Sequence, residues 1–306
     1  MKIFLAGATG FIGHALLYRL LEGKHQLLVL VRNPQKAQRL PDAAQTVHGD
    51  PTRSGKWQEE AASADVIINL TGSSIFTRWT PRAKQQIMDS RVLSTRHLVD
   101  AMLTAASPMT LINASGVNYY GMDDEAIKSE ESGPGDDFLA RVCQAWENEA
   151  FRAAEHGHRV VTTRQAVVLG SGGGALAQML PPFRLGLGGR LGHGRQPFPW
   201  IHQDDLTSIF AYICNNPDIS GPVNCAAPQI ITNAEFTRSL GKALRRPTLL
   251  PAPGFIIRLL LGEMSSLLLD GTRVTPAVLE KHGFKFRFPD IDQALTNLLT
   301  THNRKR

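Results

Sequence analysis

The stretch "KIFLAGATGFIGHALLYRLLEGKHQLLVLV" (residues 2–31) decides the fold. It opens with a short apolar strand, "KIFLA" (2–6), that breaks in a glycine-rich turn. From Phe11 the apolar residues recur at helical spacing, and a second apolar strand follows at 25–31. A strand, a helix and a strand within about 30 residues predict a parallel pair joined by a right-handed crossover.

The same alternation continues along the chain. Further apolar strands are predicted at 65–70, 109–115 and 159–170, and long helices at 81–103 and 138–157. The strands are nearly continuous runs of Val, Ile and Leu, which is typical of a sheet covered on both faces. The pattern therefore predicts an α/β protein: a Rossmann, doubly wound parallel sheet with a smaller C-terminal lobe.

The periodicity changes after residue 170. We expect residues 1–170 to form a Rossmann domain, to which later strands and helices around 200–230 return. Segments 171–200 and 231–306 are expected to form a C-terminal substrate lobe. The first of these segments is rich in Gly and Pro and is predicted to be a long functional loop.

Composition excludes several classes of protein. The 306 residues carry a net charge of +6, with no basic stripe that would indicate nucleic-acid binding. The cysteines at 143, 214 and 225 form no paired motif, so we expect neither a disulfide framework nor a metal site. No secretory leader or membrane span is expected, which favours the cytoplasm. The apolar stretch 255–269 is too short to cross a bilayer and is predicted to be a buried or partner-facing helix.

The motif "GATGFIG" directly follows the first strand and opens the first helix. Gly7 permits a tight turn, Gly10 lets a pyrophosphate approach the backbone, and Gly13 allows close packing of helix and strand. The alternative is a merely structural glycine turn. The predicted cofactor contacts here are Gly7, Ala8, Thr9, Gly10, Phe11, Ile12 and Gly13.

Strand ends elsewhere extend this predicted site. Arg32 follows the second strand, where an NAD-preferring protein usually carries an acid, so we predict NADP(H) over NAD(H). The alternative is a solvated arginine. Asp50 is predicted to contact the adenine amino group, and the ends of two later strands are predicted to line the cofactor. Those later residues are Leu70, Thr71, Gly72 and Ser115.

Longer motifs resemble a known family. "GATGFIG", "NLTG" (69–72) and "NASGVNYYG" (113–121) resemble the extended short-chain dehydrogenase/reductase superfamily. The segments 179–206 and 251–289 are similar to its atypical, YfcH-like NAD(P)-dependent epimerase branch and that branch's C-terminal module. The resemblance covers essentially the whole chain. It implies an NADP-binding Rossmann domain, a variable lobe over the cofactor, and a cytoplasmic protein of the kind described as a nucleoside-sugar epimerase.

The family's usual catalytic pair is missing. Those enzymes use a Tyr and a Lys four residues later on one helix, together with a Ser that Ser115 matches. Alignment on "WE" (146–147) places Leu139 and Cys143 at the two positions, and a shift by one gives Phe138 and Val142. Tyr119 or Tyr120 is a conceivable proton donor; the alternative is that both only pack around the nicotinamide. Cys143 is expected to be a buried, inert thiol rather than a nucleophile.

Basic residues near the predicted site suggest an anionic substrate. Arg164 ends a strand, where ligands of doubly wound sheets lie, and Arg184 and Arg195 lie in the Gly-rich segment. His202 is a further candidate substrate contact. The alternatives are a mobile basic loop, and capping of a helix by Asp204 and Asp205. The charged residues Lys128, Glu130 and Glu131 are expected to be solvated.

The sequence thus favours an NADP(H)-binding oxidoreductase or nucleotide-sugar epimerase-like enzyme that acts on an anionic small molecule. The alternative is a catalytically impaired NADP-binding sensor or scaffold protein, suggested by the missing Tyr-Lys pair. A nucleic-acid role is a distant third. The oligomeric state is left open.

Overall fold

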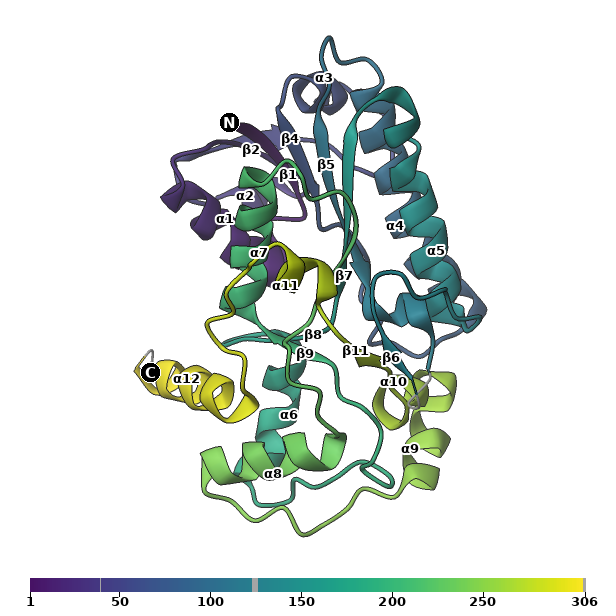
Figure 1. Ribbon diagram of the computed structural model, residues 1–306, viewed down its shortest axis with the longest axis vertical. Helices are drawn as coiled ribbons and strands as arrows, with labels where there is room; N and C mark the ends of the chain where they lie inside the picture. The colour runs from purple at the N-terminus through teal and green to yellow at the C-terminus, as the bar shows by residue number, and fades with distance from the viewer. Residues whose placement is uncertain (39, 123–125, 305–306) are drawn as a thin grey trace.

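The computed structural model describes residues 1–38, 40–122 and 126–304, and it confirms the predicted fold class. Seven strands form one parallel sheet in the order β10-β7-β5-β4-β1-β2-β3 (Figure 1). Their bounds are β1 Lys2–Ala6, β2 Gln26–Val31, β3 Ala44–His48, β4 Val66–Asn69, β5 Thr110–Gly116, β7 Arg159–Gln165 and β10 Gly221–Cys225. The chain reverses its direction of travel across the sheet between β1 and β4, so the carboxyl ends of these strands form the crevice where such sheets bind ligands.

Helices cover both faces of this sheet. On one face α1 (Phe11–Glu22) and α7 (Gln203–Asn215) pack on an apolar cluster that includes Leu5, Val29 and Ile112. The short helices α2 and α11 are Pro34–Ala37 and Ala277–Lys281. The opposite face is covered by α3 (Trp57–Ala62), α4 (Pro81–Met102) and α5 (Phe138–Phe151). The sheet is therefore the central layer of three.

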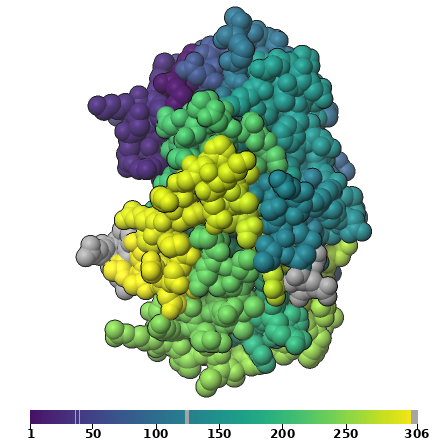
Figure 2. Space-filling model, viewed as in Figure 1, coloured from purple at the N-terminus to yellow at the C-terminus, as the bar shows by residue number. Residues whose placement is uncertain are grey.

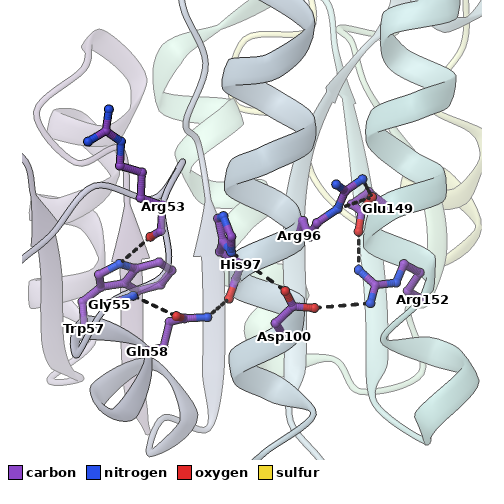
Figure 3. Close-up of polar contacts among 9 residues, drawn as sticks. All are labelled: Arg53, Gly55, Trp57, Gln58, Arg96, His97, Asp100, Glu149 and Arg152. Atoms are coloured by element: carbon purple, nitrogen blue, oxygen red, sulfur yellow. Dashed lines mark hydrogen bonds and ion pairs between the residues drawn. The ribbon is translucent and has the colours of Figure 1, made fainter.

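Polar contacts fix α4 between its two neighbours (Figure 3). Gln58 of α3 donates to the carbonyl of His97 at 2.9 Å, which joins α3 to α4. Arg96 of α4 bonds Glu149 of α5 at 2.9 Å, and Arg152 bridges Glu149 and Asp100. The Trp57 indole anchors the start of α3 on the Arg53 carbonyl. These contacts fix the position of α4 relative to α3 and α5, and with it the positions of the α4 side chains.

The C-terminal lobe has its own apolar core, which includes Phe198, Trp200 and Phe236. Around it pack α6 (Gly174–Arg184), α8 (Asn233–Leu244) and α12 (Ile291–Arg304), below the sheet in Figure 1. The remaining helices are α9 Gly254–Leu261 and α10 Ser266–Leu269, and the 3-10 turns are η1 Val117–Tyr120, η2 Ala154–His156 and η3 Gly262–Ser265. Figure 2 shows the C-terminal residues, coloured yellow, covering the centre of one face.

Two predictions for the region 159–200 were wrong. The strand expected at 159–170 is two strands in different sheets, because β7 ends at Gln165 and β8 (Val167–Leu169) pairs instead with β9 (Trp200–His202). The expected long loop contains α6, although Pro181 and Pro182 lie within that helix. Leu176, Leu180 and Phe183 recur at helical spacing, and their burial stabilises the helix against the two missing amide donors.

The apolar stretch predicted at 255–269 is not a buried helix. It is divided among α9, a 3-10 turn and α10, because Gly262 takes a positive φ of 59°. Within α9 Phe255 and Leu259 are 71% and 81% exposed. Contact with a partner stays a prediction. Within the described ranges, no helix combines the length and the apolar character that crossing a membrane requires.

A last two-stranded sheet ties the C-terminal region to the loop after β5. It pairs β6 (Ile127–Lys128) with β11 (Arg273–Val274) in parallel. Glu130, expected to be solvated, is buried nearby, where its Oε1 accepts hydrogen bonds from the backbone N–H groups of Asn224 and Val278. The prediction was wrong because the loop is covered by residues far away in sequence.

Candidate functional site

The glycine turn has the geometry that a bound pyrophosphate needs. Gly7 takes a positive φ of 93°, and a Cβ on Gly13 would lie 2.2 Å from the Gly7 carbonyl oxygen. Gly10 is the N-cap of α1 and offers no side-chain cap, so the first N–H groups of this 12-residue helix lack a side-chain acceptor. Unpaired N–H groups at a helix start, beside a backbone without side chains, fit the phosphates of a dinucleotide.

Two of the predicted adenine-side residues lie close together. Arg32 is exposed at the end of β2, and Asp50 follows β3. Burial raises the pKa of Asp50, but hydrogen bonds from Thr52 and the nearby Arg32 and Arg53 outweigh it, so the net shift is downward. The carboxylate therefore stays ionised, and the acceptor needed to bind an adenine amino group is present beside a cation.

The end of β4 carries the predicted residues Leu70, Thr71 and Gly72. The backbone of Leu70 lies against Gly7, whose Cβ would be 2.8 Å from the Leu70 carbonyl carbon. The Thr71 hydroxyl bonds Asn69 Oδ1 at 2.5 Å and Ser94 at 2.6 Å. These contacts bring the β4 end next to the glycine turn, as expected for one nucleotide crevice.

A cavity of about 370 Å³ lies between the sheet and the C-terminal lobe. Of the predicted site residues, Phe11, Ile12 and Ser115 line it. Most of its wall is apolar and comes from both parts of the molecule: Ile75, Val117, Val142, Trp146, Val167, Met179, Phe198, Leu267 and Leu268. Its position places it at the end of the glycine turn, and its size suits a small ligand.

Ser115 is held by a buried ion pair. Its hydroxyl donates to Glu147 Oε1 at 2.6 Å, and Glu147 forms two parallel bonds with Arg164, at 2.9 and 2.8 Å. Glu147 and Arg164 are each 3% exposed. Arg164 was predicted to contact substrate. Its guanidinium is instead paired with Glu147, and the residue does not line the cavity. Glu147 acts as the acceptor that orients Ser115, a role the sequence did not reveal.

Tyr119 and Tyr120 contact Arg164 and do not line the cavity. The Tyr120 hydroxyl donates to Asn224 Oδ1 at 2.6 Å and accepts from Arg164 at 2.9 Å. Burial raises the pKa of Tyr120 to about 12, although Arg164 favours its ionisation. The Tyr119 ring stacks on Arg164, with 3.4 Å between ring centroid and guanidinium carbon. The structure therefore gives both rings packing and hydrogen-bonding contacts.

The usual Tyr and Lys positions hold apolar or inert groups. Leu139 and Cys143 of α5 are both buried and both line the cavity. Burial, together with nearby Glu147, raises the pKa of the Cys143 thiol to about 11. At neutral pH this sulfur is a thiol, so it is a poor nucleophile.

Three further predicted substrate residues are not brought to the cavity. Arg184, Arg195 and His202 lie outside its wall. His202 instead caps α7, because its Nδ1 accepts from the Asp204 N–H at 3.0 Å, and its ring stacks on Phe288.

The expected acids are at the helix start, since Asp204 and Asp205 lie in the first turn of α7, but the N-cap hydrogen bond is accepted by the preceding His202 and by neither acid. The buried Asp205 carboxylate accepts the N–H groups of Arg287 and Phe288, at 2.8 and 2.9 Å. It anchors the C-terminal segment on α7 and does not line the cavity.

Seven polar residues of the described cavity wall were missed, among them Asn118, Gln165, Asn233 and Asp270. Arg91 lies on α4, and Gln196 and Thr272 come from the C-terminal lobe. Gln196 Oε1 and Thr272 Oγ1 are buried without a hydrogen-bond partner among the described residues. Arg91 could have been suspected as a cation within a largely polar helix, but periodicity alone does not tell which polar residue faces a cavity.

A parallel Rossmann sheet, a glycine turn at its switch point and a cavity under a C-terminal lobe define the class of extended Rossmann proteins. The chain belongs to the NAD dependent epimerase/dehydratase family, whose model matches residues 3–226. Residues 252–298 match a domain of unknown function, DUF1731. The predicted resemblance to an epimerase-like branch with a C-terminal module is thereby confirmed.

Relatives match over nearly the whole chain. An epimerase family protein SDR39U1 homolog, chloroplastic, of Arabidopsis thaliana is 37% identical, covering 98% of this chain and 87% of its own. The epimerase family protein YfhF of Bacillus subtilis is 36% identical, covering 98% of both chains. The structure of human SDR39U1 with NADPH has a TM-score of 0.88 at 34% identity, covering 98% of this chain and 99% of the human one.

Proposed function

We propose that the protein is an NADP(H)-dependent oxidoreductase or epimerase-like enzyme that acts on an anionic small molecule. The observation that carries this proposal is the continuity of the site. The glycine turn leads directly into a cavity that also contains Ser115, because Phe11 and Ile12 belong to both. The NADPH in the solved human relative supports the choice of cofactor.

The chain's residues have distinct roles in this proposal. The glycine turn and the start of α1 would bind the phosphates, while Ser115 would hold a substrate oxygen. Because the Ser115 hydroxyl gives its one proton to Glu147, it would hold the substrate by accepting a hydrogen bond from a substrate hydroxyl, in one orientation. The nicotinamide, when bound, supplies or accepts the hydride. The apolar walls from both lobes would exclude water from this reaction.

Arg32 is proposed to favour NADP(H) by binding the 2′-phosphate. We expect wild-type protein to bind NADPH at least about tenfold more tightly than NADH, because a charge-assisted contact to phosphate has that order of strength. Calorimetric titration of Arg32→Ala should show this preference lost. Arg53→Ala is the matched control, because Arg53 also lies near Asp50 but follows the strand by several residues. An NADPH preference that persists in Arg32→Ala would contradict the assignment.

Catalysis is tested with purified protein and 4-deuterated NADPH. A panel of carbonyl compounds and nucleotide sugars should reveal deuterium transfer to at least one compound, and Ser115→Ala should reduce its rate by about a hundredfold. Tight NADPH binding without transfer to any compound would count against an enzyme.

That outcome would favour a second candidate, a cofactor-binding sensor or scaffold. The observation behind it is that Leu139 and Cys143 replace the proton-transfer pair while Tyr120 is bonded to Arg164 and Asn224. A sensor should bind a protein partner differently with and without NADPH, and Ser115→Ala should leave that difference intact.

A further inference from the structure

Arg91 is a cation in the cavity wall without a carboxylate partner among the described residues. It projects from α4, and its Nη1 donates to two backbone carbonyls, those of Ser73 and Ile87, each at 3.1 Å. Neither acceptor is charged. A guanidinium has five N–H donors, so further donors are left for a ligand.

The guanidinium is held in place by close packing. A Cβ on Gly72 would lie 3.0 Å from its Cζ, so the group lies against the bare backbone that follows β4. On another side it lies over the Trp146 ring, with 5.1 Å between Cζ and the ring centroid. Burial lowers the pKa of Arg91, but a guanidinium starts from so high a value that it stays charged at neutral pH.

The other candidate cations do not serve this cavity. Arg164 is neutralised by Glu147, and Arg184 and Arg195 lie outside the wall. Among the described wall residues, Arg91 supplies the positive charge. Asp270, an exposed residue that follows α10, supplies a negative one. No ion pair joins these two among the described residues, and the rest of the wall is mostly apolar. An unpaired charge in such surroundings is unfavourable unless an anion joins it.

We propose that Arg91 binds the carboxylate of the substrate, so that the substrate is a small monoanionic acid with an apolar body. One guanidinium and apolar walls match a single negative charge better than the two charges and polar sugar of a nucleotide sugar. This inference rests on the proposed function, because it assigns the substrate class of the same cavity.

The test compares two probes that differ in charge and share a ring. Benzoate and benzamide are titrated by calorimetry into protein saturated with NADP⁺. Wild-type protein should bind benzoate at least about tenfold more tightly than benzamide. Arg91→Met should lose this preference, and Arg91→Lys should keep part of it, because lysine retains the charge without the planar fork. Arg195→Met, an exposed control outside the wall, should behave as wild type.

Three results would overturn the assignment: no saturable benzoate binding by wild type, equal binding of the two probes, or a preference that survives in Arg91→Met. A large loss of NADPH affinity in Arg91→Met with the benzoate preference intact would place Arg91 on the cofactor and would also overturn it. Melting temperatures identify a variant that fails to fold, in which case Arg91→Lys and Arg91→Gln decide. Failure of wild type to bind NADPH would instead overturn the proposed function.

Discussion

Arg164 connects residues from four parts of the chain. Its guanidinium pairs with Glu147 of α5, bonds Tyr120 of η1, and stacks on Tyr119. Through Tyr120 it also reaches Asn224 of β10. Since Glu147 in turn orients Ser115, the position of the Ser115 hydroxyl depends on a residue that never touches the cavity.

Removal of this cation should strongly destabilise the protein. Arg164→Met leaves the buried Glu147 carboxylate without its partner, and the free energy of unfolding should fall by about 3–5 kcal/mol. Urea denaturation measures the change. Arg19→Met is the matched control, because Arg19 and Glu22 form an exposed pair worth less than about 1 kcal/mol. A similar decrease in the free energy of unfolding in both variants would show that the buried pair contributes no more to stability than the exposed one.

At this scale the sequence predicted positions better than roles. Ser115 was placed correctly beside the cavity, one residue before the end of β5, because the apolar pattern fixes the strand end to within a residue. Arg164 was also at a strand end, but whether its guanidinium faces a ligand or a buried acid depends on Glu147, a partner on another element. Such pairings between distant residues leave no local pattern.

The close packing of α1 on the glycine turn requires a residue without a side chain at Gly13. Because Gly13 packs against the Gly7 carbonyl, Gly13→Ala should push α1 away from β1 and lower the free energy of unfolding by about 1–3 kcal/mol. NADPH affinity should fall as well. Gly133→Ala is the control, since a Cβ there meets nothing within 4 Å. Unchanged stability and NADPH affinity in Gly13→Ala would contradict the close-packing account.

Elements with a clear period were predictable, and those stabilised by distant contacts were not. The strands that open at Lys2 and Gln26 and the helix that follows Gly10 match their expected places. The division at Ala166 was missed because its N–H bonds the Cys225 carbonyl, while β8 finds its partner in β9. Helix α6 was missed because Pro181 and Pro182 argue against a helix in the local sequence. The burial of its apolar face, which stabilises the helix, depends on distant parts of the chain.

The junction between sheet and C-terminal lobe should be sensitive to acid. Burial lowers the pKa of His202, which stacks on Phe288 and contacts Asn297 of α12. The unfolded chain therefore binds a proton more readily, and stability that is complete above the unfolded value of about 6.5 is lost as the pH falls below it. Wild type should thus melt at a lower temperature at pH 5.5 than at pH 7.5.

His202→Asn isolates this effect. Asparagine can still cap α7 but does not titrate, so the difference in melting temperature between the two pH values should shrink. His193→Asn, in an exposed loop, should leave the difference unchanged. An equal pH response in wild type and His202→Asn would rule out the junction as its source. The sequence suggested His202 as a substrate contact, and only the lobe arrangement reveals its partners.

The contact between Gly72 and Arg91 has a consequence for how this chain can change over evolutionary time. A Cβ at position 72 would approach the guanidinium carbon of Arg91 to 3.0 Å, so the guanidinium would have to shift by a few tenths of an ångström. Because Arg91 is held by its bonds to Ser73 and Ile87, the two positions are expected to change together: relatives that keep the arginine should mostly keep the glycine. In relatives where another residue replaces the arginine, substitution of the glycine should be tolerated. Comparison of the residues at positions 72 and 91 across many relatives would thus show in which branches the cavity lost its positive charge.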